Sequence, residues 1–243
     1  MLNQIYEIAK IVFTASLRKK LILASILIML PLLLAFWLFE ASNPGFQSGF
    51  VLDAGSGLMS FISIIIISVL SFEQLFWVSE QQTPWFYFCR LKSRILYPIG
   101  KFLGISSVLG ILLFVFATLL FLLIGFTADT FVFLSFKMAF MIWAEYSLLL
   151  SIIVLFSTFM SRLMSVGMMI SVFFIAQSAS YLKTLFPGWL SEILLIALPD
   201  VGIFEIAIDS NNYYAIFLAF IYSVFMSSFY ITLAGFILNR KDL

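Results

Sequence analysis

The chain has 243 residues, of which 63% are hydrophobic and 10% are charged, with a net charge of +1 and a mean hydropathy of +1.16. Soluble domains carry about 25% charged residues, so this composition excludes a soluble enzyme and predicts a protein embedded in lipid. Histidine is absent and Cys89 is the only cysteine, which excludes histidine-based acid–base chemistry and an intrachain disulfide. We therefore expect no covalent catalysis, no directly bound cofactor or metal, and no nucleic-acid partner.

The first twenty residues, 1–20, are predicted to form an amphipathic helix before the membrane domain. Ile5, Ile8 and Val12 recur at helical spacing, and Lys10 lies on the opposite face. Such a helix is expected to lie in the plane of the membrane interface, with its basic end near anionic headgroups. The alternative is an ordinary cytoplasmic helix, which is less favoured because so short a helix is marginal unless its apolar side is buried.

Six apolar runs are long enough to cross about 30 Å of hydrocarbon. The sequence therefore predicts an all-α, polytopic membrane protein with six transmembrane helices in one transmembrane domain, residues 1–243. The predicted spans are Leu21 to Phe39, Ser60 to Val78, Phe102 to Phe126, Met138 to Phe159, Leu163 to Leu182 and Tyr213 to Leu238.

The distribution of basic residues predicts the orientation. With both termini in the cytoplasm, all of the 13 Lys and Arg residues except Lys137 and Lys183 fall on the cytoplasmic side, as the positive-inside rule requires. Seven acids fall on the outer side, which by itself predicts nothing, because acids are largely indifferent to this rule.

A second apolar stretch, Trp189 to Leu198, is too short to cross the membrane. It is bracketed by Pro187, Gly188 and Pro199, which stop helices. We expect this segment to dip into the membrane or lie on its surface before the last span.

The longest inner loop, Val78 to Gly104, combines aromatic and basic residues. One interpretation is a surface helix that starts near Thr83 and Pro84, with aromatic side chains for a partner's groove and basic side chains for its acids. The other is an aromatic belt with a positive-inside cluster, which needs no partner. Composition alone favours the second interpretation. The side chains concerned are Trp85, Phe86, Arg90, Lys92 and Arg94.

The order of residues in this loop changes the balance. Glu80 and Thr83 follow the second span, and Ser93-Arg94 and Gly100-Lys101 precede the third. This pattern resembles the permeases of the type-2 ABC exporter family. The N-terminal helix, the six spans, the broken segment and the short charged tail resemble that family along the whole chain. The proline that usually precedes Ser-Arg in the family is absent here.

The resemblance implies that this loop couples the chain to a separate ABC ATPase subunit, which would bind the ATP and Mg. It also implies a second permease copy or a homologous permease, and a location in the inner (plasma) membrane of a bacterium or archaeon. The chain itself lacks a P-loop, because Phe102 follows Lys101 and Ile95 stands at the first glycine position. The predicted coupling residues are Glu80, Thr83, Pro84, Trp85, Phe86, Arg90, Lys92, Ser93, Arg94 and Lys101.

Two carboxylates fall inside predicted spans. Glu73 and Glu145 each cost a few kcal/mol in lipid, so each is expected to face the bundle, the transport path or the interface. For Glu73 we favour a structural role with its side chain at the nearby interface, and for Glu145 the structural and functional interpretations are equal. The fifth span is poor in bulky residues and carries Ser171, Gln177 and Ser178, which indicates either a permease interface or ordinary helix packing.

The rival hypothesis is a stand-alone secondary carrier or channel that uses Glu73 and Glu145 as proton or cation sites. An intramembrane enzyme is weaker, because such enzymes usually need the histidine that is absent here. The transported substrate does not follow from the sequence.

Overall fold

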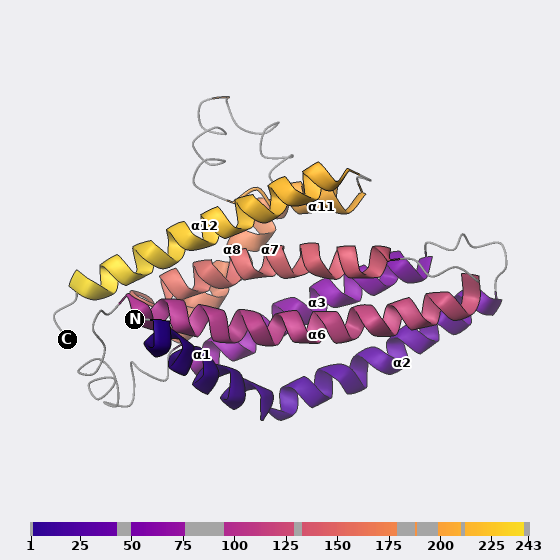
Figure 1. Cartoon of the computed structure of the whole chain (residues 1–243), viewed down its shortest axis with the longest axis horizontal. Helices are drawn as coiled ribbons and strands as arrows, with labels where there is room; N and C mark the ends of the chain where they lie inside the picture. Colours follow the sequence, from indigo (N-terminus) through magenta and orange to yellow (C-terminus); the bar gives the residue numbers. More distant parts are fainter. Residues whose placement is uncertain are drawn as a thin grey trace.

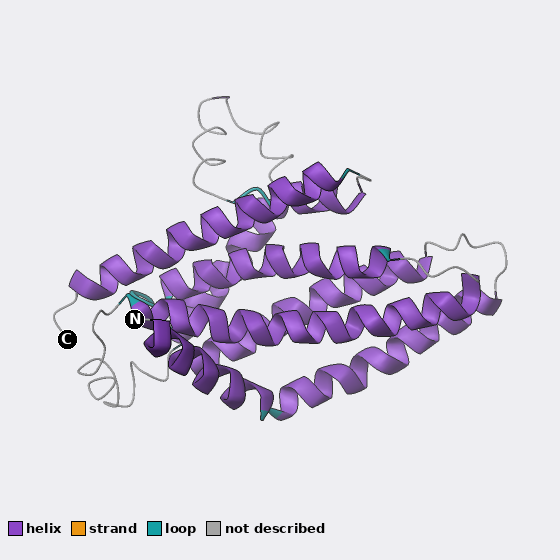
Figure 2. Cartoon of the chain, in the orientation of Figure 1, coloured by secondary structure: helices purple, strands orange, loops and turns teal. Residues whose placement is uncertain are grey.

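The computed structural model describes residues 2–42, 50–75, 95–128, 133–178, 188, 199–209 and 212–240. Within these ranges the chain forms helices joined by short turns, with no strand (Figure 2). The helices are α1 (Leu2–Leu17), α2 (Lys20–Ser42), α3 (Phe50–Gln74), α6 (Leu96–Ala128), α7 (Leu134–Phe156), α8 (Arg162–Gln177), α11 (Gly202–Asp209) and α12 (Tyr213–Arg240).

Five of the described helices, α2, α3, α6, α7 and α12, are long and apolar enough to cross a membrane. The chain is therefore a multi-pass membrane protein, and the all-helical prediction is confirmed. The fifth predicted span, Leu163 to Leu182, corresponds to α8, which has 16 residues and is shorter than the roughly 20 that a crossing needs. That span was predicted to continue to Leu182, beyond the described part of this helix, so six crossings remain a prediction.

Helix α7 occupies the centre of the bundle. Its whole inner stretch from Ala144 to Leu155 is buried, and it contacts α3, α6, α8, α11 and α12. Figure 1 shows α12 and α11 on one side of α7, α3 and α6 on the other, and α2 beyond them. The start of α1 and the end of α12 lie at the same end of the bundle (Figure 1).

The N-terminal helix α1 packs against the first turns of α6. Gly100 and Gly104 of α6 are spaced as in a GxxxG motif, which allows two helix backbones to approach closely. A Cβ added at Gly100 would lie 2.7 Å from the Ile8 Cβ, and one at Gly104 would lie 2.9 Å from the Ala9 carbonyl oxygen. The prediction of a helix here is confirmed, and part of its apolar face is buried by α6, since Ile8 and Val12 are both buried.

Two helix boundaries differ from the sequence prediction. Helix α3 begins at Phe50 rather than near Ser60. Its first turns contain polar residues, so the sequence did not indicate a span there. In the structure these turns are stabilised by the burial of Val51, Leu52 and Gly55. Helix α6 begins at Leu96, six residues before the predicted span, because α1 covers its first turns.

The segment before the last span contains a helix that was not predicted, α11. Val201, Phe204 and Ala207 are buried at helical spacing, and the Asp200 side chain accepts a hydrogen bond from the Gly202 amide at 3.1 Å, as an N-cap does. The predicted re-entrant stretch Trp189 to Leu198 lies outside the described residues.

Replacing Gly104 by leucine should force α1 away from α6. The added side chain has no room beside the Ala9 backbone, so we expect destabilisation of about 1–3 kcal/mol, the usual cost of overpacking. The measurement is the thermal unfolding midpoint of the detergent-purified chain. The matched control is Gly167→Leu, because a Cβ at Gly167 meets nothing within 4 Å. Equal midpoints for the two variants would contradict the close α1–α6 contact.

Candidate functional site at the end of helix α3

The end of the bundle where α1 begins and α12 ends carries most of the described basic residues. We call it the basic end. Among the described Lys and Arg residues the exception is Lys137, near the start of α7; the others lie on α1 (Lys10), at the α1–α2 turn (Arg18, Lys19 and Lys20), near the start of α6 (Lys101), at the start of α8 (Arg162) and at the end of α12 (Arg240). This is the asymmetry that the positive-inside rule associates with a cytoplasmic face.

Three cations from three different segments contact the last turn of α3. The Lys19 Nζ lies 2.7 Å from the Glu73 Oε2, and the Lys101 Nζ donates a hydrogen bond of 2.6 Å to the Gln74 carbonyl oxygen. The Arg162 guanidinium lies 5.6 Å from the centre of the Phe72 ring. We call these six residues the α3-end cluster.

The Lys101 contact is the most enclosed of the three. Its side chain is only 6% exposed, and its Nζ also lies 5.4 Å from the Tyr97 ring. The last carbonyls of a helix have no partner within the helix, and a cation there is favourable. Lys101, predicted as part of the coupling segment, therefore joins α6 to the end of α3 instead of standing on the surface.

The Lys19–Glu73 ion pair is more exposed, with side-chain exposures of 41% and 38%. Solvent screening limits such a pair to about 0–1 kcal/mol. The structural interpretation of Glu73 agrees with this position, since the carboxylate reaches the basic end and finds a cation there. Glu73 lines a groove between the α1–α2 turn and α3. None of the other described residues that line this groove is acidic.

Nine of the predicted coupling residues lie outside the described residues: Glu80, Thr83, Pro84, Trp85, Phe86, Arg90, Lys92, Ser93 and Arg94. The structure does describe where this segment leaves and rejoins the bundle. Leu75 follows the α3-end cluster directly and is buried. Ile95 packs against α12, since a Cβ on Gly235 would come within 2.9 Å of its Cγ1.

Away from the basic end, Gln177 contacts Glu205, which the sequence analysis counted only as an outer acid. The Gln177 Nε2 donates a hydrogen bond to the Glu205 Oε1, which joins the end of α8 to α11. Glu145 is buried on α7 and interacts electrostatically with Glu205. Glu205 lies on α11. The apolar residues of α11 recur at helical spacing, but its eight residues are too few for that pattern to indicate a helix from the sequence.

The other two predicted residues of the fifth span do not join this group. The Ser171 Oγ is exposed and donates to the Gly167 carbonyl oxygen of its own helix at 2.9 Å. Ser178 is exposed at the C-cap of α8. They share a helix with an exposed apolar face that includes Leu163, Met164 and Phe174.

A groove lined by hydroxyl groups, which the sequence did not reveal, lies between α6, α7 and α12. Its volume is about 280 Å³. Ser106 and Ser147 share a hydrogen bond of 2.8 Å, the Ser223 Oγ donates to the Ala144 carbonyl at 2.6 Å, and the Trp143 Nε1 donates to the Ser106 carbonyl at 3.0 Å. These bonds are distributed over three helices, so the spacing within any one of them gives no hint.

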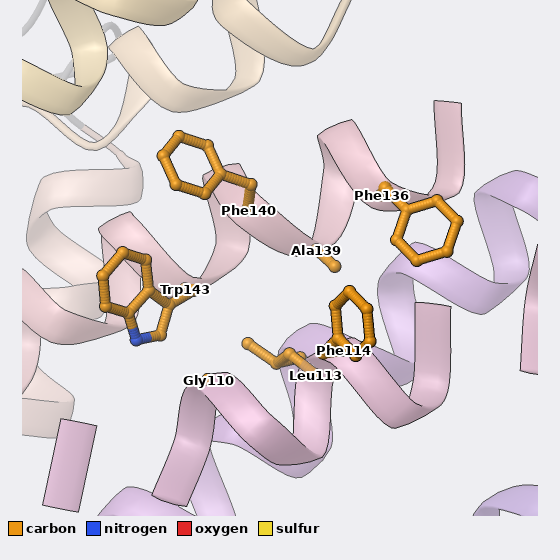
Figure 3. A pocket seen from close by; sticks show the side chains of 7 residues that line it. All are labelled: Gly110, Leu113, Phe114, Phe136, Ala139, Phe140 and Trp143. Atoms are coloured by element: carbon orange, nitrogen blue, oxygen red, sulfur yellow. The ribbon is translucent and has the colours of Figure 1, made fainter. Parts of the chain in front are cut away.

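Trp143 also borders an apolar cleft of about 400 Å³ between α6 and α7. Figure 3 shows Phe136 and Trp143 on α7 beside Gly110, Leu113 and Phe114 on α6, while the Phe140 ring points away from α6. The described residues that line the two openings are apolar side chains and serines. Among the described residues, no group of three or more His, Cys, Asp or Glu could hold a metal ion.

Comparison of the chain with models of known protein families and with curated proteins finds no match.

Replacing Lys101 by methionine should loosen the last turn of α3 while changing global stability little. The variant leaves the Gln74 carbonyl without this partner, which destabilises the folded state by about 1–3 kcal/mol. It also removes a buried charge, and the loss of its desolvation cost offsets this destabilisation. We expect amide hydrogen exchange of residues 70–75 to accelerate by roughly ten-fold. Lys10→Met, at an exposed position on α1, is the control. Unchanged exchange in Lys101→Met would show that Lys101 does not hold this turn.

Proposed function

We propose that the chain is the permease subunit of an ATP-driven exporter of the type-2 ABC class, and that a separate ATPase subunit supplies the energy. The observation that supports this proposal best is the α3-end cluster. It joins the helix that precedes the predicted coupling segment to three other parts of the bundle. The family resemblance stated above supplies the identity of the motor.

The cluster gives a mechanical reason for the proposal. A force on residues 76–94 would act first on Leu75 and on the last turn of α3. Because Lys19, Lys101 and Arg162 hold that turn, α3 would move together with the α1–α2 turn, α6 and the start of α8. The buried Lys101 bond should transmit most of this force, since the exposed ion pair is weak.

The proposed partners follow from the same arrangement. The ATPase subunit would bind ATP and Mg and would contact the aromatic and basic residues of the coupling segment. A second permease copy or a homologous permease would cover the exposed apolar face of α8, where Leu163 is 78% exposed and Met164 is 63% exposed. Lipid would cover the outward faces of α2 and α12.

Charge reversal of the coupling segment should separate the chain from its motor. In Arg90→Glu/Lys92→Glu/Arg94→Glu we expect the copurifying ATPase activity to fall at least ten-fold, because three favourable contacts with acidic groups become repulsive. The measurement is ATPase activity recovered with the tagged chain from its native membrane. The control is Arg240→Glu, which changes a basic residue at the end of α12 whose guanidinium lies 4.5 Å from the centre of the Phe236 ring.

Two results would contradict the exporter proposal. One is the absence of any ATPase subunit with the unaltered chain. The other is equal ATPase recovery with the triple variant and with the control.

A second candidate function, a proton- or cation-coupled carrier, is favoured by one observation. Buried Glu145 interacts electrostatically with Glu205, and Gln177 binds the same Glu205. A carboxylate in the middle of a transmembrane helix is expensive unless it is paired, protonated or functional. Repulsion between two carboxylates favours the uptake of a proton by one of them.

The Glu145→Gln variant distinguishes the two functions. Under the exporter proposal we expect it to keep most of the ATPase coupling, since Gln preserves the shape of the side chain and the motor binds elsewhere. The readouts are ATPase recovery and the flux of protons or Na⁺ into vesicles that contain the purified chain alone. A flux by the chain alone that Glu145→Gln abolishes would replace the exporter proposal with the carrier.

A further inference from the structure

A groove of about 520 Å³ lies at the basic end, between the α1–α2 turn and α3. It combines a charged rim with an apolar wall. The residues that line it are Arg18, Lys19, Lys20, Ala24, Val69, Leu70 and Glu73.

The rim carries an excess of positive charge. Among the described residues that line the groove, Glu73 is the only acid, and it pairs with Lys19. Arg18 and Lys20 are exposed, and within the described part of the chain no ion pair involves either of them. Helix α2 begins at Lys20, so the positive end of its helix dipole adds positive potential to the same place.

The wall of the groove is apolar and continues onto lipid-facing surface. Ala24 on α2 and Val69 and Leu70 on α3 form it. Farther along α2, Leu23 is 65% exposed and Leu27 is 64% exposed. The rim stands where a membrane-crossing helix begins, which is the depth of lipid headgroups. A free phosphate or another soluble anion has no apolar chain that could pack against this wall.

We propose that this groove binds an anionic phospholipid. Arg18 and Lys20 contact the headgroup phosphate, Lys19 is shared between the phosphate and Glu73, and one acyl chain lies along Ala24, Val69 and Leu70. The proposal is independent of the exporter function, because it rests on the charge and shape of the groove alone.

Glu73 makes the proposal specific. Its carboxylate competes with the lipid phosphate for Lys19 and repels it. Glu73→Gln should therefore bind anionic lipid more tightly than the unaltered chain, although it loses an ion pair. A purely structural role for the pair would leave lipid binding unchanged or weaken it.

The test is a lipid titration of the detergent-purified full chain, followed by native mass spectrometry. Phosphatidylglycerol is compared with phosphatidylcholine, and glycerol phosphate is added as a soluble competitor. We expect at least a ten-fold preference for phosphatidylglycerol. Each of Arg18→Gln and Lys20→Gln should weaken the binding of phosphatidylglycerol about five-fold, and Glu73→Gln should strengthen it. The control is Lys10→Gln, on the exposed side of α1 outside the groove, which should leave this binding unchanged.

Three results would overturn the proposal. The first is equal binding of the two lipids. The second is a preference for phosphatidylglycerol that survives Arg18→Gln/Lys20→Gln. The third is displacement of the lipid by glycerol phosphate at the same concentration as by phosphatidylglycerol, which would indicate a phosphate site without the acyl chain.

Discussion

The structure depends on one constraint: in hydrocarbon, every polar group must find its partner inside the protein. Many hydroxyl groups in the helices satisfy it, although within the described residues the buried Ser68, Ser71, Ser135 and Ser227 hydroxyls have no hydrogen-bond partner. The Ser63 Oγ donates to the Met59 carbonyl and the Ser151 Oγ to the Leu148 carbonyl, each within one helix. Where such a hydroxyl instead reaches a neighbouring helix, as the Ser223 Oγ reaches the Ala144 carbonyl, it fixes the position of α12 on the central helix α7.

The same constraint determines where charges lie. Lys101 can stay buried because the free carbonyl at the end of α3 accepts its hydrogen bond. Lys137 solves the same problem at the other end of the bundle, where its Nζ donates to the Ile208 carbonyl at the end of α11 at 2.7 Å. In both cases a lysine stabilises the end of a helix that is not its own. The ends of α3 and α11 are therefore each joined to a neighbouring helix by a lysine.

The sequence predicts what depends on local composition. The apolar runs of α2, α6, α7 and α12 are long and uninterrupted, so these helices follow from chain length and hydropathy alone. The first turns of α3 do not, since Asp53, Gly55 and Gly57 dilute the apolar signal and only burial against other helices compensates. Helix α11 has eight residues, too few for a periodicity to stand out.

The candidate site depends on contacts between distant segments, which explains why the sequence located it only in part. Glu73 was singled out as a carboxylate inside a predicted span and Lys101 through the family resemblance, but nothing in their spacing indicates that Lys19 and the Gln74 carbonyl are their partners. The family motif treats Gly100-Lys101 as one unit, although the two residues contact different helices. Gly100 faces α1 while Lys101 faces α3, so this dipeptide connects two neighbours of α6 at once.

Lys19 connects the two proposals physically. It belongs to the turn between α1 and α2, it lines the groove proposed for a phospholipid, and it holds Glu73 at the end of α3. A phosphate that draws Lys19 toward the membrane would weaken its hold on Glu73 without touching the buried Lys101 bond. The end of α3 would then be fixed to α6 but less firmly to the α1–α2 turn. Anionic lipid and a force on the coupling segment would thus both act on the last turn of α3. The lipid would act through the exposed Lys19–Glu73 ion pair, and the force would act through the backbone.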